Sequence, residues 1–162
     1  AAQLAHTIAQ ANQVRTAVSL SDISMVTIFK ENLQRILGNG VHTLFCNEEE
    51  ALAWANTDRL DVAISELKDI AQEVFVTIGA RGSVVIDEHG QQKDSPGLDV
   101  TPVDTNGAGD IYAGACLAAR CQGADAFDAA KFANHAAAYL ITQYGARLKT
   151  LQAYADLKSA YA

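Results

Sequence analysis

The sequence predicts an α/β fold with a mainly parallel sheet, and three observations lead to it. Helical and strand patterns alternate along the chain, and the expected strands are short apolar runs rich in β-branched residues. The chain has 162 residues, of which 49% are hydrophobic, enough for one globular domain with a buried core. Strands joined through helices pair in parallel, so helices should cover both faces of this sheet.

The first half of the chain is expected to alternate helices with buried strands. Ser21 or Asp22 can cap the second helix, and the sequence Gly38-Asn39-Gly40 ends it. The expected elements are a helix at about 2–12, a strand at 14–20, a helix at 25–37, a strand at 41–46, helices at about 48–55 and 58–71, and a strand at 74–78.

In the second half, a glycine-rich turn at 79–82 leads into a strand at 83–86, and residues 87–90 close a hairpin. An extended run near 100–103 precedes helices at about 109–122, 125–142 and 150–160. Ligands of open parallel sheets bind beyond the carboxyl ends of the strands. Asn47, Gly79 and the segment 104–110 each follow an expected strand, so we expect them all at strand ends.

Composition excludes several classes of partner. A net charge of −7 argues against nucleic acid and against an anionic membrane surface. There is no apolar run long enough for a bilayer and no signal peptide, so we expect a soluble, cytoplasmic protein. Three cysteines without C-x-x-C spacing indicate reduced thiols. The four histidines have no metal-ligand spacing, so no zinc site is expected.

The segment Asp104-Thr105-Asn106-Gly107-Ala108-Gly109-Asp110 is the most informative part of the chain. Its glycines let the backbone approach a ligand closely, and the helix that follows directs free N–H groups and a partial positive charge toward it. Such a helix start binds anions, most often phosphate. A carboxylate there makes sense if it accepts a proton from a hydroxyl that attacks the phosphate.

Two established nucleotide fingerprints do not account for this segment, because it matches neither G-x-x-x-x-G-K-[ST] nor G-x-G-x-x-G. A simple helix start, capped by Asp104 or Asp110, is the alternative. The complete string closely resembles the anion-hole motif of the ribokinase-like (PfkB) carbohydrate and nucleoside kinases. That resemblance implies a three-layer α/β/α fold, Asp110 as the catalytic base, and backbone amides of Gly107, Ala108 and Gly109 around the transferred phosphate.

The sequence Asn47-Glu48-Glu49-Glu50 follows an expected strand. By itself it fits an Asn cap with acidic residues in the first helical turn. Beside the preceding motif, Asn47 and Glu50 resemble the N-x-x-E motif of the same kinases. The resemblance implies that they organise Mg²⁺, largely through water, and the phosphates of ATP. Mg²⁺ suits such a site because it keeps several waters and takes few direct carboxylate ligands.

Further ATP contacts are implied by the same resemblance. Thr77, Gly79 and Gly82 resemble a loop that lies over the phosphates and ribose, although turn formation alone could explain both glycines. Asn134, on a helix face with alanines one turn away, resembles an adenine contact; close helix packing is the alternative. Gly145 and Ala146 would close that pocket. Asp104 and Asn106 resemble positions that hold a monovalent cation such as K⁺ in some members.

The resemblance extends over essentially the whole chain, and it looks most like the bacterial adenosine-kinase-like sugar kinases. Since the chain starts without Met, inside a helical pattern, we expect residues 1–162 to be the ATP-binding and catalytic portion of such a kinase, without its N-terminal acceptor-binding half and lid. The expected activity is phosphorylation of a hydroxyl on a nucleoside or sugar. Alternatives are a ribokinase- or fructokinase-type acceptor and an inactive nucleotide-binding fragment. Exposed apolar surface would favour self-association, for example as a homodimer.

Overall fold

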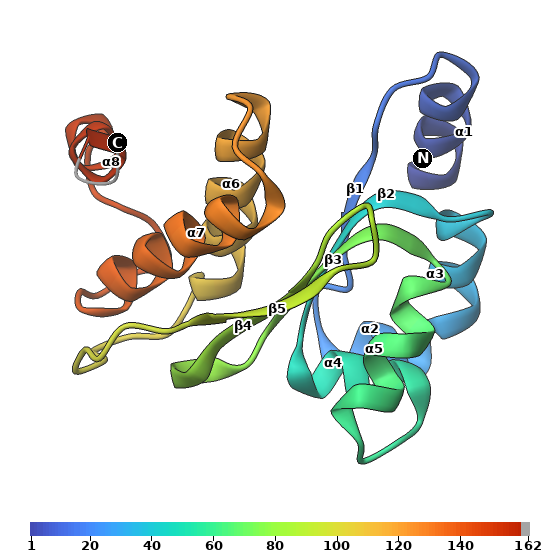
Figure 1. Cartoon of the computed structure of the whole chain (residues 1–162), viewed down its shortest axis with the longest axis horizontal. Helices are drawn as coiled ribbons and strands as arrows, with labels where there is room; N and C mark the ends of the chain where they lie inside the picture. Colours follow the sequence, from blue (N-terminus) through green and yellow to red (C-terminus); the bar gives the residue numbers. More distant parts are fainter. Residues whose placement is uncertain (160–162) are drawn as a thin grey trace. The chain divides into compact units, whose positions relative to one another are not determined.

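A computed structural model describes residues 1–159 of the chain (Figure 1). The helix expected at 150–160 is therefore described up to residue 159. In chain order the elements are α1 (Ala2–Ala11), β1 (Ala17–Ser19), α2 (Ile23–Ile28), α3 (Lys30–Leu37), β2 (Val41–Asn47), α4 (Glu48–Ala55), α5 (Leu60–Lys68), β3 (Ala71–Thr77), the 3-10 helix η1 (Gly79–Arg81), β4 (Gly82–Ile86), β5 (Gln92–Pro96), α6 (Ala108–Cys121), α7 (Ala126–Ile141) and α8 (Leu151–Ser159). The chain divides into two compact units, residues 1–78 with 84–93, and residues 79–83 with the chain from 94 onward.

The strands hydrogen-bond in the order β1-β2-β3-β4-β5. β1 and β3 both run parallel to β2, with Thr43 of β2 opposite Ala17 and Glu73. β4 and β5 form the expected hairpin, whose turn is held by the Asp87 carboxylate as it accepts hydrogen bonds from two amides of the turn, 2.9 and 2.8 Å away. The α/β fold with a mixed, mostly parallel sheet is therefore confirmed.

In the first unit, alternate residues of the strands form two buried layers. Leu44, Val74 and Ile86 belong to a core cluster that also includes apolar residues of α2, α3, α4 and α5. On the opposite face of β2 and β3, the rings of Phe45 and Phe75 stack with their centroids 5.1 Å apart. Both rings are buried. Burial on both faces explains why these strands appear in the sequence as continuous apolar runs.

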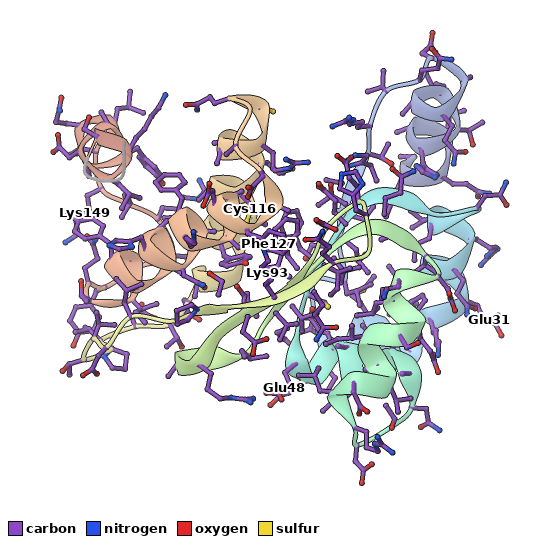
Figure 2. All side chains as sticks on the ribbon, viewed as in Figure 1. Glu31, Glu48, Lys93, Cys116, Phe127 and Lys149 are labelled. Carbon is purple, nitrogen blue, oxygen red and sulfur yellow. The ribbon has the colours of Figure 1, made fainter. Side chains whose placement is uncertain are left out.

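In the second unit, α6 and α7 pack against each other. α7 is rich in alanine, and Ala129 and Ala133 are fully buried, so the two helix backbones can approach closely. The thiol of Cys116 on α6 lies 3.6 Å from the carbonyl oxygen of Ala129 on α7; Figure 2 labels Cys116 on α6 and Phe127 on α7. Tyr112 of α6 donates a 2.7 Å hydrogen bond to Ser83 Oγ, which connects α6 to β4.

Three expectations about secondary structure need correction. The helix expected at 25–37 is two helices separated at Phe29; Thr27 Oγ donates to the carbonyl of Ile23, a local bond that bends helices. The run 100–103 is not a strand, because Pro102 has no N–H and the amide of Val103 donates to the carbonyl at the end of α7. The strand expected at 14–20 is limited to Ala17–Ser19.

Among the described residues, every helix is too short or too polar to pass through a lipid bilayer.

Candidate functional site

The first candidate group lies where β2 ends and α4 begins. Asn47 Oδ1 accepts a 2.8 Å hydrogen bond from the amide of Glu50. In return, the Glu50 carboxylate accepts from the Asn47 backbone amide at 3.1 Å and from the Asn47 side-chain amide at 2.9 Å. Asn47 and Glu50 therefore form a capping box, in which each side chain satisfies an amide at the helix start.

The Glu50 carboxyl group is buried, with 5% of the residue exposed. Burial raises its pKa above the ordinary value; the hydrogen bond from the Asn47 amide opposes this shift, and the negative charges of Asp22 and Glu49 add to it. Both Glu50 oxygens accept hydrogen bonds from Asn47. A metal ion could replace these bonds only by breaking the cap, whereas a metal-bound water could approach without doing so.

Thr77 lies next to this group, at the end of β3. The strand register pairs it with Asn47, and Thr77 Oγ donates a 3.5 Å hydrogen bond to the carbonyl of Cys46. The Cys46 thiol is buried, and burial raises its pKa far above the usual range. Cys46 is consequently an inert core thiol.

Two of the predicted glycines are required by backbone packing. Gly82 has a φ of +99°, and a Cβ added to it would lie 2.1 Å from the carbonyl oxygen of Ser95. Gly107 has a φ of +79°, and its Cβ would lie 2.4 Å from the carbonyl oxygen of Ala146. No larger residue fits at either position without moving the backbone. Gly79 also has a positive φ, of +63°, but a Cβ there would meet open space.

The carboxylate of Asp104 holds the loop before α6 through two hydrogen bonds, one within the loop and one to the segment after α7. Its Oδ1 accepts from the amide of Asn106 at 3.0 Å, and its Oδ2 accepts from the amide of Gly145 at 2.9 Å. These two bonds, that from Asn106 first, lower the pKa of the Asp104 carboxyl group and keep it ionised. The loop is thus attached to the 145–146 segment through Asp104 and through the close approach of Gly107 to Ala146.

The start of α6 is open. Gly107 is the N-cap and has no side chain with which to cap the helix, and the amide of Ala108 donates to the carbonyl of Thr105 at 3.2 Å. The amides of Gly109 and Asp110 belong to the first turn, where α-helical amides have no acceptor within the helix. A Cβ at Gly109 would meet nothing within 4 Å, and Gly109 does not have a positive φ. Neither packing nor backbone conformation explains a glycine here, where it weakens the helix.

Asp110 is the third residue of α6 and is exposed. Within residues 1–159, nothing hydrogen-bonds to its carboxylate. It lies on the wall of a pocket of about 950 Å³ in the second unit, together with Arg147, Lys158, and small or apolar residues of α6 and α7. An exposed carboxylate without partners, beside open amides at a helix start, is available to accept a proton from a bound hydroxyl.

Asn134 is buried, with 6% of the residue exposed, and its side-chain amide donates hydrogen bonds to groups of the second unit. Asn134 Nδ2 lies 3.0 Å from both the hydroxyl and the carbonyl oxygen of Ser95, and 3.3 Å from Ser83 Oγ. These contacts fit the packing alternative, because the amide ties α7 to β4 and β5. The adenine contact implied by the sequence resemblance stays a prediction.

The structure therefore groups the predicted residues by unit. Asn47, Glu50 and Thr77 lie together in the first unit. In the second unit, Asp104 and Gly107 bring the segment from Asp104 to Asp110 against Gly145 and Ala146. Sequence reasoning missed Arg147, which shares the pocket wall with Asp110, and Ser83, which joins Tyr112 to the Asn134 amide. Neither residue stands in a motif, so no signal in the sequence could have indicated it.

Comparison with known proteins identifies the family of this chain. The model of the pfkB family carbohydrate kinases matches residues 1–153. The chain belongs to the pfkB family of carbohydrate kinases. The ribokinase-like resemblance of the sequence is confirmed at the level of family and fold.

Several known proteins are similar to this pfkB family chain. Adenosine kinase of Saccharomyces cerevisiae is 34% identical over 110 residues, which are 60% of this chain and 32% of that protein. The crystal structure of adenosine kinase from Sinorhizobium meliloti superimposes with a TM-score of 0.87 at 31% identity, over 98% of this chain and 49% of that one. A probable sugar kinase from Rhizobium etli gives 0.89 at 25% identity, over 99% and 49%. The chain thus spans about half the length of the solved structures that it matches.

Proposed function

We propose that this chain is the ATP-binding and catalytic portion of a kinase that transfers the γ-phosphoryl group of ATP to a hydroxyl of a nucleoside or sugar. The start of α6 carries the proposal. There, open amides, a glycine without a packing reason and an unpaired carboxylate occur within one helical turn. In this proposal the acceptor-binding half and the lid lie outside residues 1–162.

Asp110 is the proposed general base, and it removes the proton from the acceptor hydroxyl as that oxygen attacks the γ-phosphorus. The amides of Gly109 and Asp110, with that of Gly107, hydrogen-bond to the transferred phosphoryl group. Ala108 contributes backbone shape rather than a free amide, because its N–H already donates to Thr105. Phosphoryl transfer depends mainly on positioning and on charge stabilisation, which fixed amides at a helix start provide.

Mg²⁺ is the proposed metal, and the donor set at α4 fits it in an outer role. Asn47 and Glu50 offer oxygen atoms, the ligand type that Mg²⁺ prefers, but the capping box already uses them. These two residues would hold metal-bound waters, and Mg²⁺ would offset the negative charge of the phosphates. The structure of a putative ribokinase II from E. coli, 25% identical to this chain with a TM-score of 0.81, is a complex with ATP and Mg²⁺.

The remaining contacts to ATP are proposed residue by residue. Thr77, Gly79 and Gly82 would contact the phosphates and ribose, and Gly145 with Asn134 would lie near adenine. For Asn134 this requires exchange of its present hydrogen bonds to β5. Asp104 and Asn106 would hold a monovalent cation such as K⁺; the ionised Asp104 carboxylate supplies negative charge for it.

Adenosine or a similar nucleoside is the first proposed acceptor, because two relatives above 30% identity are named adenosine kinases. A simple sugar is the second, since the probable sugar kinase of R. etli has the highest TM-score of the three solved structures described above. A longer protein that also binds ATP without transferring phosphate would support the third alternative, in which these residues bind a nucleotide and have no kinase activity.

The test combines binding with turnover. Calorimetric titration with a non-hydrolysable ATP analogue measures nucleotide binding by the chain, and we expect weak binding with Mg²⁺ present. Transfer of labelled phosphate from ATP is then assayed with adenosine, ribose, fructose and a sugar phosphate, in the isolated chain and in the longer protein proposed to contain it. We expect transfer by the longer protein alone, with adenosine preferred. Robust turnover by residues 1–162 would show that the division into portions is wrong, and absence of ATP binding in both would refute the kinase proposal.

A further inference from the structure

A second cluster of ionisable side chains lies at the other edge of the first unit. His42 and Glu73 stand near the amino ends of β2 and β3, whereas Asn47 and Thr77 end the same strands. Glu88 belongs to the turn between β4 and β5, in the same unit. His42 is five residues from Asn47, which along a strand is about 16 Å. The cluster is therefore separate from the residues proposed to act on ATP.

Hydrogen bonding fixes the ring of His42. Its Nδ1 lies 2.9 Å from the hydroxyl of Thr43, and that hydroxyl donates its proton to Glu73 Oε2 at 3.2 Å. Because the hydroxyl has only one proton, it must accept from Nδ1, so Nδ1 carries a hydrogen and Nε2 of the neutral ring carries the lone pair. A histidine that binds a metal commonly donates its second ring N–H to such an acceptor, which orients the ring.

The lone pair of His42 faces the Glu88 carboxylate. Nε2 and Glu88 Oε2 lie 4.0 Å apart, which is too long for a hydrogen bond. Two ligands of one tetrahedral zinc ion, each about 2.0–2.2 Å from it, lie roughly 3.3–3.5 Å from each other. Glu88, whose side chain is 41% exposed, could close the difference by a small movement. One ligand atom from each of His42, Glu73 and Glu88 lies within 4.8 Å of the other two.

Charge also favours a cation at this cluster. Glu73 is 1% exposed, and burying its carboxylate is costly unless positive charge offsets it. Two carboxylates and a neutral imidazole together carry the charge that a divalent cation neutralises. Imidazole with carboxylate is a ligand set for zinc and similar transition metals rather than for Mg²⁺.

The space beside the cluster supports a bound ion with water. His42 and Glu88 line a pocket of about 670 Å³, and His6 of α1 lines the same pocket. His6 is 8% exposed, and within residues 1–159 neither of its ring nitrogens has a hydrogen-bond partner. Buried polar atoms normally have partners, so this pocket has donor capacity that the described protein groups do not use.

We propose that His42, Glu73 and Glu88 bind a divalent transition-metal ion, with zinc as the reference metal. Bound there, the ion connects β2, β3 and the β4–β5 turn and stabilises the first unit. Arg15 and Lys68 also line the pocket, and their positive charges oppose a cation and weaken its binding. The spacing of histidines in the sequence predicted no zinc site. The three residues meet only through the fold, since Glu73 and Glu88 follow His42 by 31 and 46 positions.

The test uses the complete chain, stripped of metal by a chelator and free of ATP. Zn²⁺ is titrated by calorimetry, and Co²⁺ by visible absorption, because tetrahedral Co²⁺ gives intense d–d bands. We expect one ion per chain. At a metal concentration a hundredfold above the dissociation constant, the thermal midpoint should rise by about 5–10 °C.

Variants separate this site from adventitious binding. Glu88→Gln, at an exposed position, should weaken Zn²⁺ binding at least tenfold and remove the midpoint shift, and His42→Gln should weaken it further. His89→Gln is the matched control, because His89 is an exposed histidine of the same turn, and it should leave both measurements unchanged. Equal losses in His89→Gln and Glu88→Gln, or no metal-dependent midpoint shift in the unchanged chain, would overturn the proposal and leave an ion pair among these groups.

Discussion

The starts of α4 and α6 have an acidic residue at the same position but differ in how their backbone amides are capped. Each has an acidic residue at the third helical position, Glu50 in α4 and Asp110 in α6. In α4, the N-cap Asn47 and the acid satisfy each other's amides. In α6, the N-cap is a left-handed glycine, Gly107, and the carboxylate of Asp110 makes no hydrogen bond within the described chain. The first helix start is closed by its own side chains, and the second is open to a ligand.

This difference indicates that the start of α6, rather than that of α4, is available for ligand binding and catalysis. An N-cap side chain such as that of Asn47 stabilises a helix start by about 1 kcal/mol relative to alanine, and a glycine N-cap is weaker than such a cap by a few tenths of a kcal/mol. Gly109 adds a further cost, because a glycine in a helix is less favourable than alanine by up to about 1 kcal/mol. Local stability is therefore lower at α6, where the open amides and the unpaired carboxylate can bind and react. Four predictions test this comparison between the two helix starts.

The largest effect is expected for Asp110→Asn, measured in the longer protein proposed to contain this chain. If Asp110 is the base, kcat should fall by about 10²–10⁴-fold, because an amide cannot take the proton of the acceptor hydroxyl. ATP binding should change little, since the amides remain. Initial rates and nucleotide titration give the two values.

Asp128→Asn is the matched control for Asp110→Asn. Asp128 is an exposed aspartate at the third position of α7 and lines the same pocket, but its carboxylate is paired with Lys131. It should retain turnover within a few-fold of the unchanged protein. If Asp110→Asn is equally active, the open start of α6 has no role in proton transfer.

The second prediction concerns the two glycines of the open start. Gly107→Ala should lower the free energy of unfolding by about 1–3 kcal/mol, since it combines a positive φ with a clash against the Ala146 carbonyl. Gly109→Ala should instead raise it, by up to about 1 kcal/mol, while it weakens binding of an ATP analogue by obstructing the amides. Urea unfolding and calorimetry measure the two quantities. Loss of stability in both variants would mean that Gly109 is also a packing glycine.

Much of the fold could be predicted because the strands are buried on both faces and the helices have clear apolar periods. The break at Phe29 could not, because it depends on the side-chain bond of Thr27 within a helical pattern that continues on both sides. The stretch 100–103 was mistaken for a strand because valines at 100 and 103 resemble one, although Pro102 weakens the pattern and the Val103 amide donates to the carbonyl at the end of α7.

Features of the site that depend on residues close in sequence were predictable, whereas features that depend on contacts between distant segments were not. Asn capping at position 47 was one of two readings of the sequence, and the structure contains that cap. The sequence predicted that all of these glycines contact a ligand. In the structure, a Cβ at Gly107 or Gly82 would clash with the backbone of another segment, whereas a Cβ at Gly109 would meet open space. Such distinctions depend on which loop packs nearby. The cluster at His42 has the same origin, because it is assembled from three separate segments.

The third prediction tests the closed start. Asn47→Ala removes the acceptor for the Glu50 amide and leaves the Glu50 carboxylate with one side-chain donor fewer. The free energy of unfolding should fall by about 0.5–2 kcal/mol. Asp110→Asn, in the same urea assay on this chain, should remain within about 0.5 kcal/mol, since no hydrogen bond is lost. If the two substitutions have equal effects on stability, the contrast between the two helix starts is wrong.

The smallest effect is the pH dependence that Glu50 gives to the closed start. Its pKa is raised in the folded chain, mainly by burial, so the folded state holds this proton to a higher pH than the unfolded chain does. Between the ordinary pKa near 4.5 and the raised value, the folded state binds more protons, and the contribution of Glu50 to stability falls as the pH increases. We therefore compare the unfolding free energy of the unchanged chain with that of Glu50→Gln at each pH. The stability of the unchanged chain relative to the variant should be highest at acidic pH, should fall through this window and should be constant above it.

Glu49→Gln, at the exposed neighbouring position, is the control, and its stability difference from the unchanged chain should depend less on pH. A difference that rises with pH would mean that the hydrogen bonds from Asn47 outweigh burial and that the capping box prefers the ionised carboxylate.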